Sequence, residues 1–90
     1  MPLMVDRLSG FQIATLRQVA ICTANGGQVA LTRAQREAMV PLWRAGAIEV
    51  WHRLVPDEGS RGPFYRPSSR GWALIKSLFG WSDAQLGRAA

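Results

Sequence analysis

Residues 42–66 read LWRAGAIEVWHRLVPDEGSRGPFYR, and their pattern changes at Gly46 from helical to alternating. Ahead of the glycine, apolar side chains recur at helical spacing, whereas residues 47–54 alternate and predict a strand. One face of that strand would carry Ile48, Val50, His52 and Leu54. Residues 56–63 are rich in turn formers and predict a loop, and 64–66 resume extended structure. The stretch therefore predicts a helix that turns at Gly46 into a β-hairpin.

A first helix is predicted over residues 11–24. Ser9 and Gln12 have the spacing of a capping box, in which each side chain satisfies a free backbone N–H at a helix start. The glycines that follow Asn25 end this helix, because glycine adopts the left-handed backbone common at helix ends. Residues 28–31 are predicted to be a short extended segment, an edge strand at most.

A second helix is predicted over 33–45, and Thr32 with Gln35 repeats the capping-box spacing. Pro41 falls inside it and removes a backbone donor, so a kink or break near Val40 is expected. A third helix begins at a cap formed by Ser68 or Ser69 and stops at Gly80, and Ser82 with Gln85 indicates one more helical turn. These elements predict an α+β domain over 9–80, between a lead-in at 1–8 and a tail at 81–90.

The composition describes one small globular domain with a basic surplus. The 90 residues are 48% hydrophobic and 19% charged, and the formal net charge is +5. Nearly all of the positive charge is arginine, because Lys76 is the only lysine, and such a surplus favours acidic partners. A single cysteine excludes an internal disulfide, and the sequence contains no apolar run of signal-peptide or membrane-spanning length. We expect a cytoplasmic chain that does not bind a membrane.

Catalytic and metal-binding patterns are absent from the sequence. His52 is the sole histidine, and the strand pattern puts it on the apolar face, which favours a structural role. The six carboxylates are scattered, and no Cys/His set with zinc spacing or glycine-rich nucleotide loop is present. We therefore expect a protein that is not an enzyme, without catalytic residues, metal ligands or a cofactor.

Residues 32–79 resemble the C-terminal half of winged helix-turn-helix proteins, in the style of MarR-like and phage-type small regulators. In those families a helix ends in leucine, a Gly-Leu-Ile segment follows, a charged wing separates two strands, and a Thr-x-x-Gly segment starts the last helix. The matching segments here are 42–49, 57–62 and 64–71. The resemblance implies a winged-helix-like order of helix, strand, helix, hairpin wing and C-terminal helix.

This chain departs from the family pattern in one respect. A full winged helix has two helices between its first strand and its hairpin, but only fifteen residues separate Leu31 from Ala47. Two explanations remain open. The helix at 11–24 serves as the positioning helix across an unusually long turn, or one helix is missing or reduced to short stretches around Pro41.

The resemblance implies a small bacterial or phage-type regulator that binds double-stranded DNA. The helix at 33–45 would enter the major groove, where arginine pairs with guanine and glutamine with adenine, while arginines of the wing follow the phosphate backbone. The residues assigned to this role are Thr32, Arg33, Gln35, Arg36, Arg53, Arg61 and Arg66. For Gln35 the alternative is a purely structural cap, and Asp57 and Glu58 in the wing would repel phosphate.

A second hypothesis keeps the scaffold but gives it a protein partner, as an adaptor or a phage-type inhibitor of a host protein. Trp43 and Trp51 have polar neighbours, and exposed tryptophan is enriched at protein interfaces. An exposed surface containing both residues and a wing without net charge would favour this hypothesis. A homodimer is compatible with either function.

Overall fold

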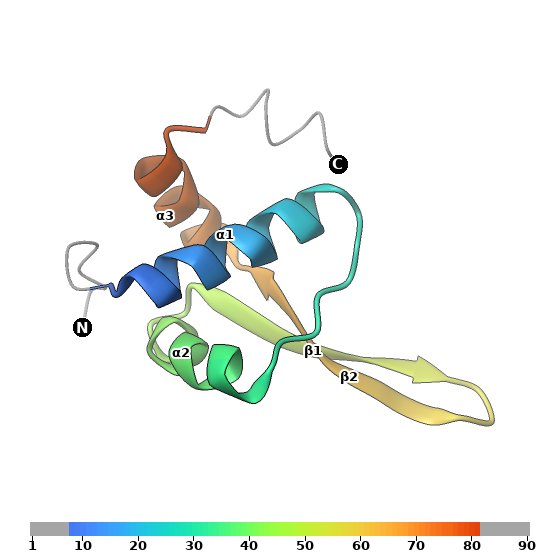
Figure 1. The fold of residues 1–90 in the computed structure, drawn as a ribbon. Helices are drawn as coiled ribbons and strands as arrows, with labels where there is room; N and C mark the ends of the chain where they lie inside the picture. Colours follow the sequence, from blue (N-terminus) through green and yellow to red (C-terminus); the bar gives the residue numbers. More distant parts are fainter. Residues whose placement is uncertain (1–7, 82–90) are drawn as a thin grey trace.

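Three helices and one hairpin make up residues 8–81, the part of the chain that the computed structural model describes (Figure 1). In chain order they are α1 (Gly10–Ala24), α2 (Arg33–Arg44), β1 (Ile48–Val55), β2 (Gly59–Pro67) and α3 (Ser69–Phe79). The predicted α+β class is confirmed. Most of the predicted lead-in, and the helical turn predicted after Ser82, lie outside the described residues.

The capping residues read from the sequence define the starts of the helices. In α1, the Ser9 hydroxyl accepts a hydrogen bond from the Gln12 backbone N–H at 3.1 Å, and the Gln12 side chain accepts from the Ser9 N–H at 2.8 Å. Thr32 and Gln35 form the same reciprocal pair at the start of α2. Of the two serines that could cap α3, Ser68 does so. These local signals predicted the helix starts correctly.

Of the kink or break expected near Val40, the break does not occur, because α2 is continuous from Arg33 to Arg44 through Pro41. The proline removes one donor, but its own carbonyl still accepts a hydrogen bond from the Ala45 N–H at 3.0 Å. Met39 and Leu42 on either side are buried in the core and hold both halves of the helix against it. Tertiary packing therefore overrides the local cost of the proline.

The hairpin is longer than the sequence predicted. β1 and β2 pair antiparallel from Ile48 opposite Pro67 to Val55 opposite Gly59, so the expected loop over 56–63 is wrong and only residues 56–58 form the turn. Asp57 has a φ of 67° and Gly59 a φ of 82°, which closes the turn tightly. Pro63 lies where the register shifts, and a proline is tolerated there because no ladder donor is needed.

The extended segment at 28–31 forms a single antiparallel bridge instead of a strand. Val29 pairs with Tyr65 on β2, and the Tyr65 N–H donates to the Val29 carbonyl at 3.2 Å. Val29 and Leu31 are both buried, so the link between α1 and α2 is fixed by its apolar side chains. The bridge lies on the edge of β2 that faces away from β1.

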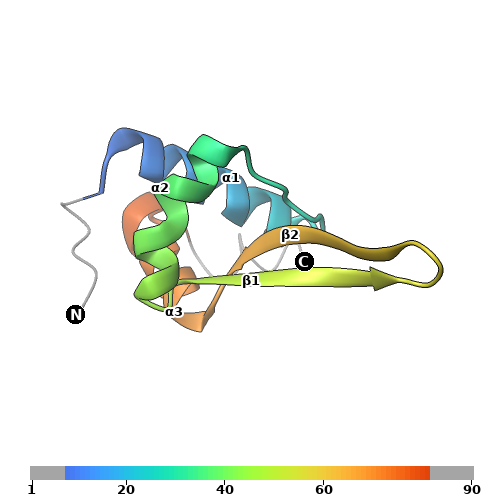
Figure 2. The same ribbon diagram turned by 90° about the horizontal axis from the view of Figure 1, so that it is seen from below.

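The core lies between the helices and the root of the hairpin. It is formed mainly by fully buried residues of the three helices, with the first residue of β1; these are Leu16, Val19, Ala20, Met39, Leu42, Ile75 and Ile48. Beyond its root the hairpin extends away from the helices (Figure 2). Val50 is therefore 40% exposed and Leu54 81% exposed, and His52 is exposed as well. Of the four residues predicted to share this face of β1, only Ile48 is buried.

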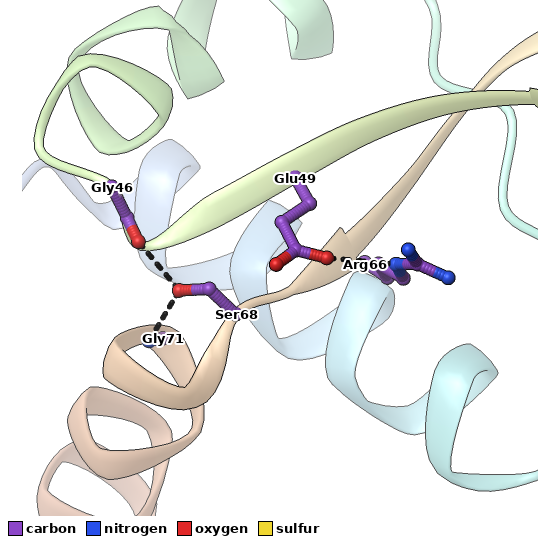
Figure 3. A network of polar contacts seen from close by, with 5 residues as sticks. All are labelled: Gly46, Glu49, Arg66, Ser68 and Gly71. Atoms are coloured by element: carbon purple, nitrogen blue, oxygen red, sulfur yellow. Dashed lines mark hydrogen bonds and ion pairs between the residues drawn. The ribbon is translucent and has the colours of Figure 1, made fainter.

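A set of short contacts ties the two ends of the hairpin together (Figure 3). The Ser68 hydroxyl donates to the Gly46 carbonyl at 2.5 Å and accepts from the Gly71 N–H at 3.1 Å. The Ser68 N–H donates to the Ala47 carbonyl at 3.0 Å. A Cβ on Gly71 would lie 1.9 Å from the Ala47 carbonyl oxygen, so only glycine allows this approach. We call these four residues, Gly46, Ala47, Ser68 and Gly71, the hairpin root.

Candidate functional site

A groove of about 350 Å³ lies between α2 and one face of the hairpin. Five of its lining residues are apolar or aromatic and three are charged; they are Met39, Val40, Trp43, Val50, Tyr65, Arg33, Arg36 and Glu37. Val50 and Tyr65 are register partners and therefore lie on the same face of the sheet. We refer to this feature as the α2–hairpin groove.

Helical spacing explains why α2 contributes apolar residues to the groove as well as to the core. Met39 and Leu42 point into the core, whereas Val40 and Trp43, three residues apart, follow Arg36 on a second stripe. Trp43 is 54% exposed, and Val40 is exposed as well. The groove therefore presents an uncovered apolar surface, which distinguishes it from the charged surface expected of this helix.

Charge at the groove is limited to its α2 side. The Arg33 Nε donates to the Glu37 carboxylate at 3.2 Å, and both side chains are exposed to solvent, so this ion pair is weak but locally neutral. The Arg36 side chain is exposed and has no ionic or hydrogen-bond partner among residues 8–81. The groove is thus apolar with one unpaired cation at its edge.

Thr32 and Gln35, both predicted to meet DNA, make structural contacts. The Thr32 hydroxyl accepts from the Gln35 backbone N–H at 3.2 Å. The Gln35 side chain accepts from the Thr32 N–H at 3.0 Å and donates from Nε2 to Gln18 of α1, also at 3.0 Å. Gln35 is half-buried, and its amide is occupied by the cap and by the contact between the two helices.

Two of the three arginines on the hairpin have a carboxylate partner. Arg66 donates to Glu49 at 2.9 Å across the strands (Figure 3), and its guanidinium lies 5.6 Å from the centre of the Trp51 ring. Arg61 pairs with Glu58 near the tip. Arg53 has no partner among the described residues. Glu49, Asp57 and Glu58 balance the three arginines, so the hairpin carries no net charge.

The predicted arginines fall into two groups, because Arg53 and its register partner Arg61 share a face of the sheet with Arg66, opposite the groove. Arg33 and Arg36 line the α2–hairpin groove. Arg66 follows Tyr65 directly, and successive side chains of a strand point to opposite faces, so Arg66 lies on the sheet face opposite the groove. Arg61 lies near the far end of the hairpin.

The two tryptophans proposed for a protein interface are separated by the same alternation. Trp51 lies on the face opposite Val50, packs against Phe64 with ring centres 5.1 Å apart, and is half-buried. Trp43 lies in the groove. Of these two tryptophans Trp43 alone lines the groove, and sequence analysis missed Val40, Val50 and Tyr65 beside it. The one sequence feature that indicates this surface is the three-residue spacing of Val40 and Trp43, which places them on the same stripe of α2.

Residues 8–81 show neither a metal-binding cluster nor a membrane span. No group of three or more His, Cys, Asp or Glu side chains in that range is arranged to hold a metal ion. None of the described helices combines the length and the hydrophobicity needed to span a bilayer. Comparison of the chain with protein-family models, with curated proteins and with solved structures finds no match in any of the three.

Proposed function

We propose that this chain is a non-enzymatic protein-interaction module built on a winged-helix-like scaffold. Its α2–hairpin groove receives an apolar side chain from a segment of a partner protein. The observation that carries the proposal is Trp43, 54% exposed and directed into an apolar groove in which Val50 is also uncovered. Exposed tryptophan in a concave apolar surface is the usual anchor of a protein interface.

The chemistry of the groove defines the class of partner. A phosphate backbone laid into it would lose water against valine and tryptophan, and Arg36 at the edge is the one unpaired cation among the described lining residues, so most of the buried contact would be costly. An aromatic or branched aliphatic side chain would bury the same surface favourably. The unpaired Arg36 at the edge adds a preference for a carboxylate next to that apolar anchor. The partner segment is therefore apolar and acidic.

The order of elements supports the scaffold assignment. The order of α2, the hairpin and α3 is the order of the C-terminal half of winged-helix proteins. Only α2 stands between the bridge and the hairpin, where those proteins have two helices. That difference, together with the neutral hairpin, favours a protein partner over standard major-groove docking.

Peptide selection tests this function directly. A display library of random dodecapeptides panned on the whole chain should enrich sequences that combine an aromatic or aliphatic residue with Asp or Glu. Trp43→Ala should weaken the selected peptides at least tenfold, because it removes the anchor contact. Arg36→Glu should weaken the acidic peptides by a similar factor.

Arg44→Glu is the matched control, since Arg44 is exposed on the same helix and does not line the groove. It should change peptide affinity less than threefold. Isothermal titration calorimetry gives the affinities. Peptides that bind all three variants equally would place their site away from the groove and overturn the proposal.

Duplex DNA is the second candidate, favoured by Arg36 and Arg53, which are exposed and unpaired in the described region, and by the net charge of +5. Fluorescence anisotropy with random-sequence duplexes at low salt measures it. Under this candidate, Arg33→Ala combined with Arg36→Ala reduces binding, and Trp43→Ala leaves it unchanged. Absence of binding at micromolar protein would exclude DNA.

A further inference from the structure

β1 has one edge that no other described segment pairs with. β2 occupies one side of β1, and Val29 bridges the far side of β2, so the order across the sheet is Val29, β2, β1 and then the open edge. The backbone hydrogen bonds among residues 8–81 leave this edge unused. In Figure 2 the outer side of β1 is clear of the labelled helices beyond the hairpin root.

The bridge at Tyr65 shows which backbone groups face the open edge. The Tyr65 N–H points to Val29 and hence away from β1. Tyr65 and Val50 are therefore a non-hydrogen-bonded pair, and the N–H and C=O of Val50 point outward. Since the direction alternates along a strand, Ile48, His52 and Leu54 also present outward groups, whereas Glu49, Trp51 and Arg53 point toward β2.

This edge lacks several of the features that keep edge strands from pairing, although it carries two charged side chains, Glu49 and Arg53, and lies opposite a register shift. Residues 48–55 contain no proline, glycine or lysine, and they form an eight-residue strand rich in β-branched and aromatic side chains. Leu54 on this strand is 81% exposed. Such an edge is a template for another strand, so a specific occupant is expected.

We propose that the occupant is a second copy of the same chain, with the two β1 strands antiparallel and Trp51 opposite Trp51. In this register Glu49 of each copy lies opposite Arg53 of the other, which forms two cross-strand ion pairs. Ile48 lies opposite Leu54. The result is a four-stranded sheet that runs through both molecules and gives Arg53 a partner that it lacks among residues 8–81 of its own chain.

Backbone direction and charge together select this register. Outward-pointing residues must face outward-pointing residues, so the two-fold axis must pass through a residue position and not between two. An axis at Val50 would place Glu49 opposite Trp51, and an axis at His52 would place Trp51 opposite Arg53. Only the axis at Trp51 sets each acid opposite a base.

Sedimentation equilibrium of the whole chain over a wide concentration range measures the association. The wild type should form a dimer, and Arg53→Glu should weaken dimerisation at least tenfold, because two attractive pairs become repulsive. Arg17→Glu is the matched control, because Arg17 is exposed, unpaired in the described region, and located on α1. It should leave the dissociation constant within about threefold of the wild-type value.

Mixing two variants tests the register itself. A chain with Glu49→Arg and Arg66→Glu keeps an ion pair between its own strands but places arginine opposite Arg53 of a second copy. Alone, this variant and Arg53→Glu should each be largely monomeric. Mixed, they should form a heterodimer at near wild-type affinity, since every cross-strand pair is then opposite in charge.

Several results would overturn the proposal: a wild-type monomer up to about 1 mM, equal effects of the Arg53 and Arg17 variants, or a mixture that does not associate. Circular dichroism checks that each variant is folded. If the doubly substituted chain does not fold, the dissociation constants of the Arg53→Glu and Arg17→Glu variants still test whether Arg53 lies in the dimer interface. Trp43→Ala should leave the dimer intact, so failure of the groove proposal and failure of this one are distinguishable.

Discussion

At the scale of single residues, the missing side chain of Gly71 sets how closely α3 approaches the segment between α2 and β1. The Ala47 carbonyl fills the space that a Cβ would need, and it accepts a hydrogen bond from the Ser68 N–H that holds it there. The same glycine was part of the family resemblance, but the sequence alone did not reveal its steric reason. The close approach depends on two segments more than twenty residues apart.

Gly71→Ala should therefore lower the free energy of unfolding by about 1–3 kcal/mol, as overpacking in a rigid site does. Urea denaturation followed by circular dichroism measures the change. Gly10→Ala is the control, because a Cβ added there would have no atom within 4 Å and alanine suits a helix. The control should equal or slightly exceed the wild-type stability. A Gly71→Ala variant as stable as the wild type would contradict the steric explanation.

At the scale of elements, the helices were predictable because their signals are local. The capping boxes at Ser9 and Thr32 and the stop at Gly80 each lie within a few residues of the boundary that they fix. The hairpin length was missed for the opposite reason. Residues 59–63 have loop composition, but pairing with β1 extends the strand through them, and that pairing is a tertiary property.

α2 offers an element-scale prediction, since it tolerates Pro41 at an exposed position inside the helix. Pro41→Ala restores the missing N–H and should raise the stability by roughly 1–3 kcal/mol, less any entropy that the proline removes from the unfolded chain. Thermal unfolding by calorimetry measures the change. A fall in the melting temperature would show that the proline ring makes a contact essential to α2.

At the scale of the whole molecule, ion pairing determines which of the arginines are free to contact a binding partner. The sequence shows that the hairpin contains as many acidic residues as arginines, but it did not predict that Arg66 pairs with Glu49, seventeen residues away. The α2–hairpin groove was also beyond sequence analysis, because α2 and two strands must meet to form it. Of the predicted protein interface, Trp43 alone lies in that groove.

The number of arginines without an ion pair predicts how strongly any affinity for duplex DNA depends on salt concentration. Of the five arginines assigned to DNA contact, Arg36 and Arg53 are available without breaking an ion pair within residues 8–81, so contacts by these two alone would make the logarithm of affinity fall with the logarithm of salt concentration at a slope of about −2. Five phosphate contacts would give a slope of about −4.5. Anisotropy titrations at several salt concentrations distinguish these values. The steeper slope would mean that Arg33, Arg61 and Arg66 exchange their carboxylate partners for phosphates.

Because the hairpin root secures the hairpin at one end, the turn at the other end can accept an inserted sequence. Both strands are secured where they leave the helices, by the Ser68 hydroxyl to Gly46 and by the Ser68 N–H to Ala47. The turn at 56–58 lies at the opposite end, far from the core (Figure 2). Its geometry is therefore uncoupled from the packing that keeps the chain folded. An epitope or fluorophore-binding peptide grafted between Asp57 and Glu58 would be displayed on a stalk without disturbing the body that carries it.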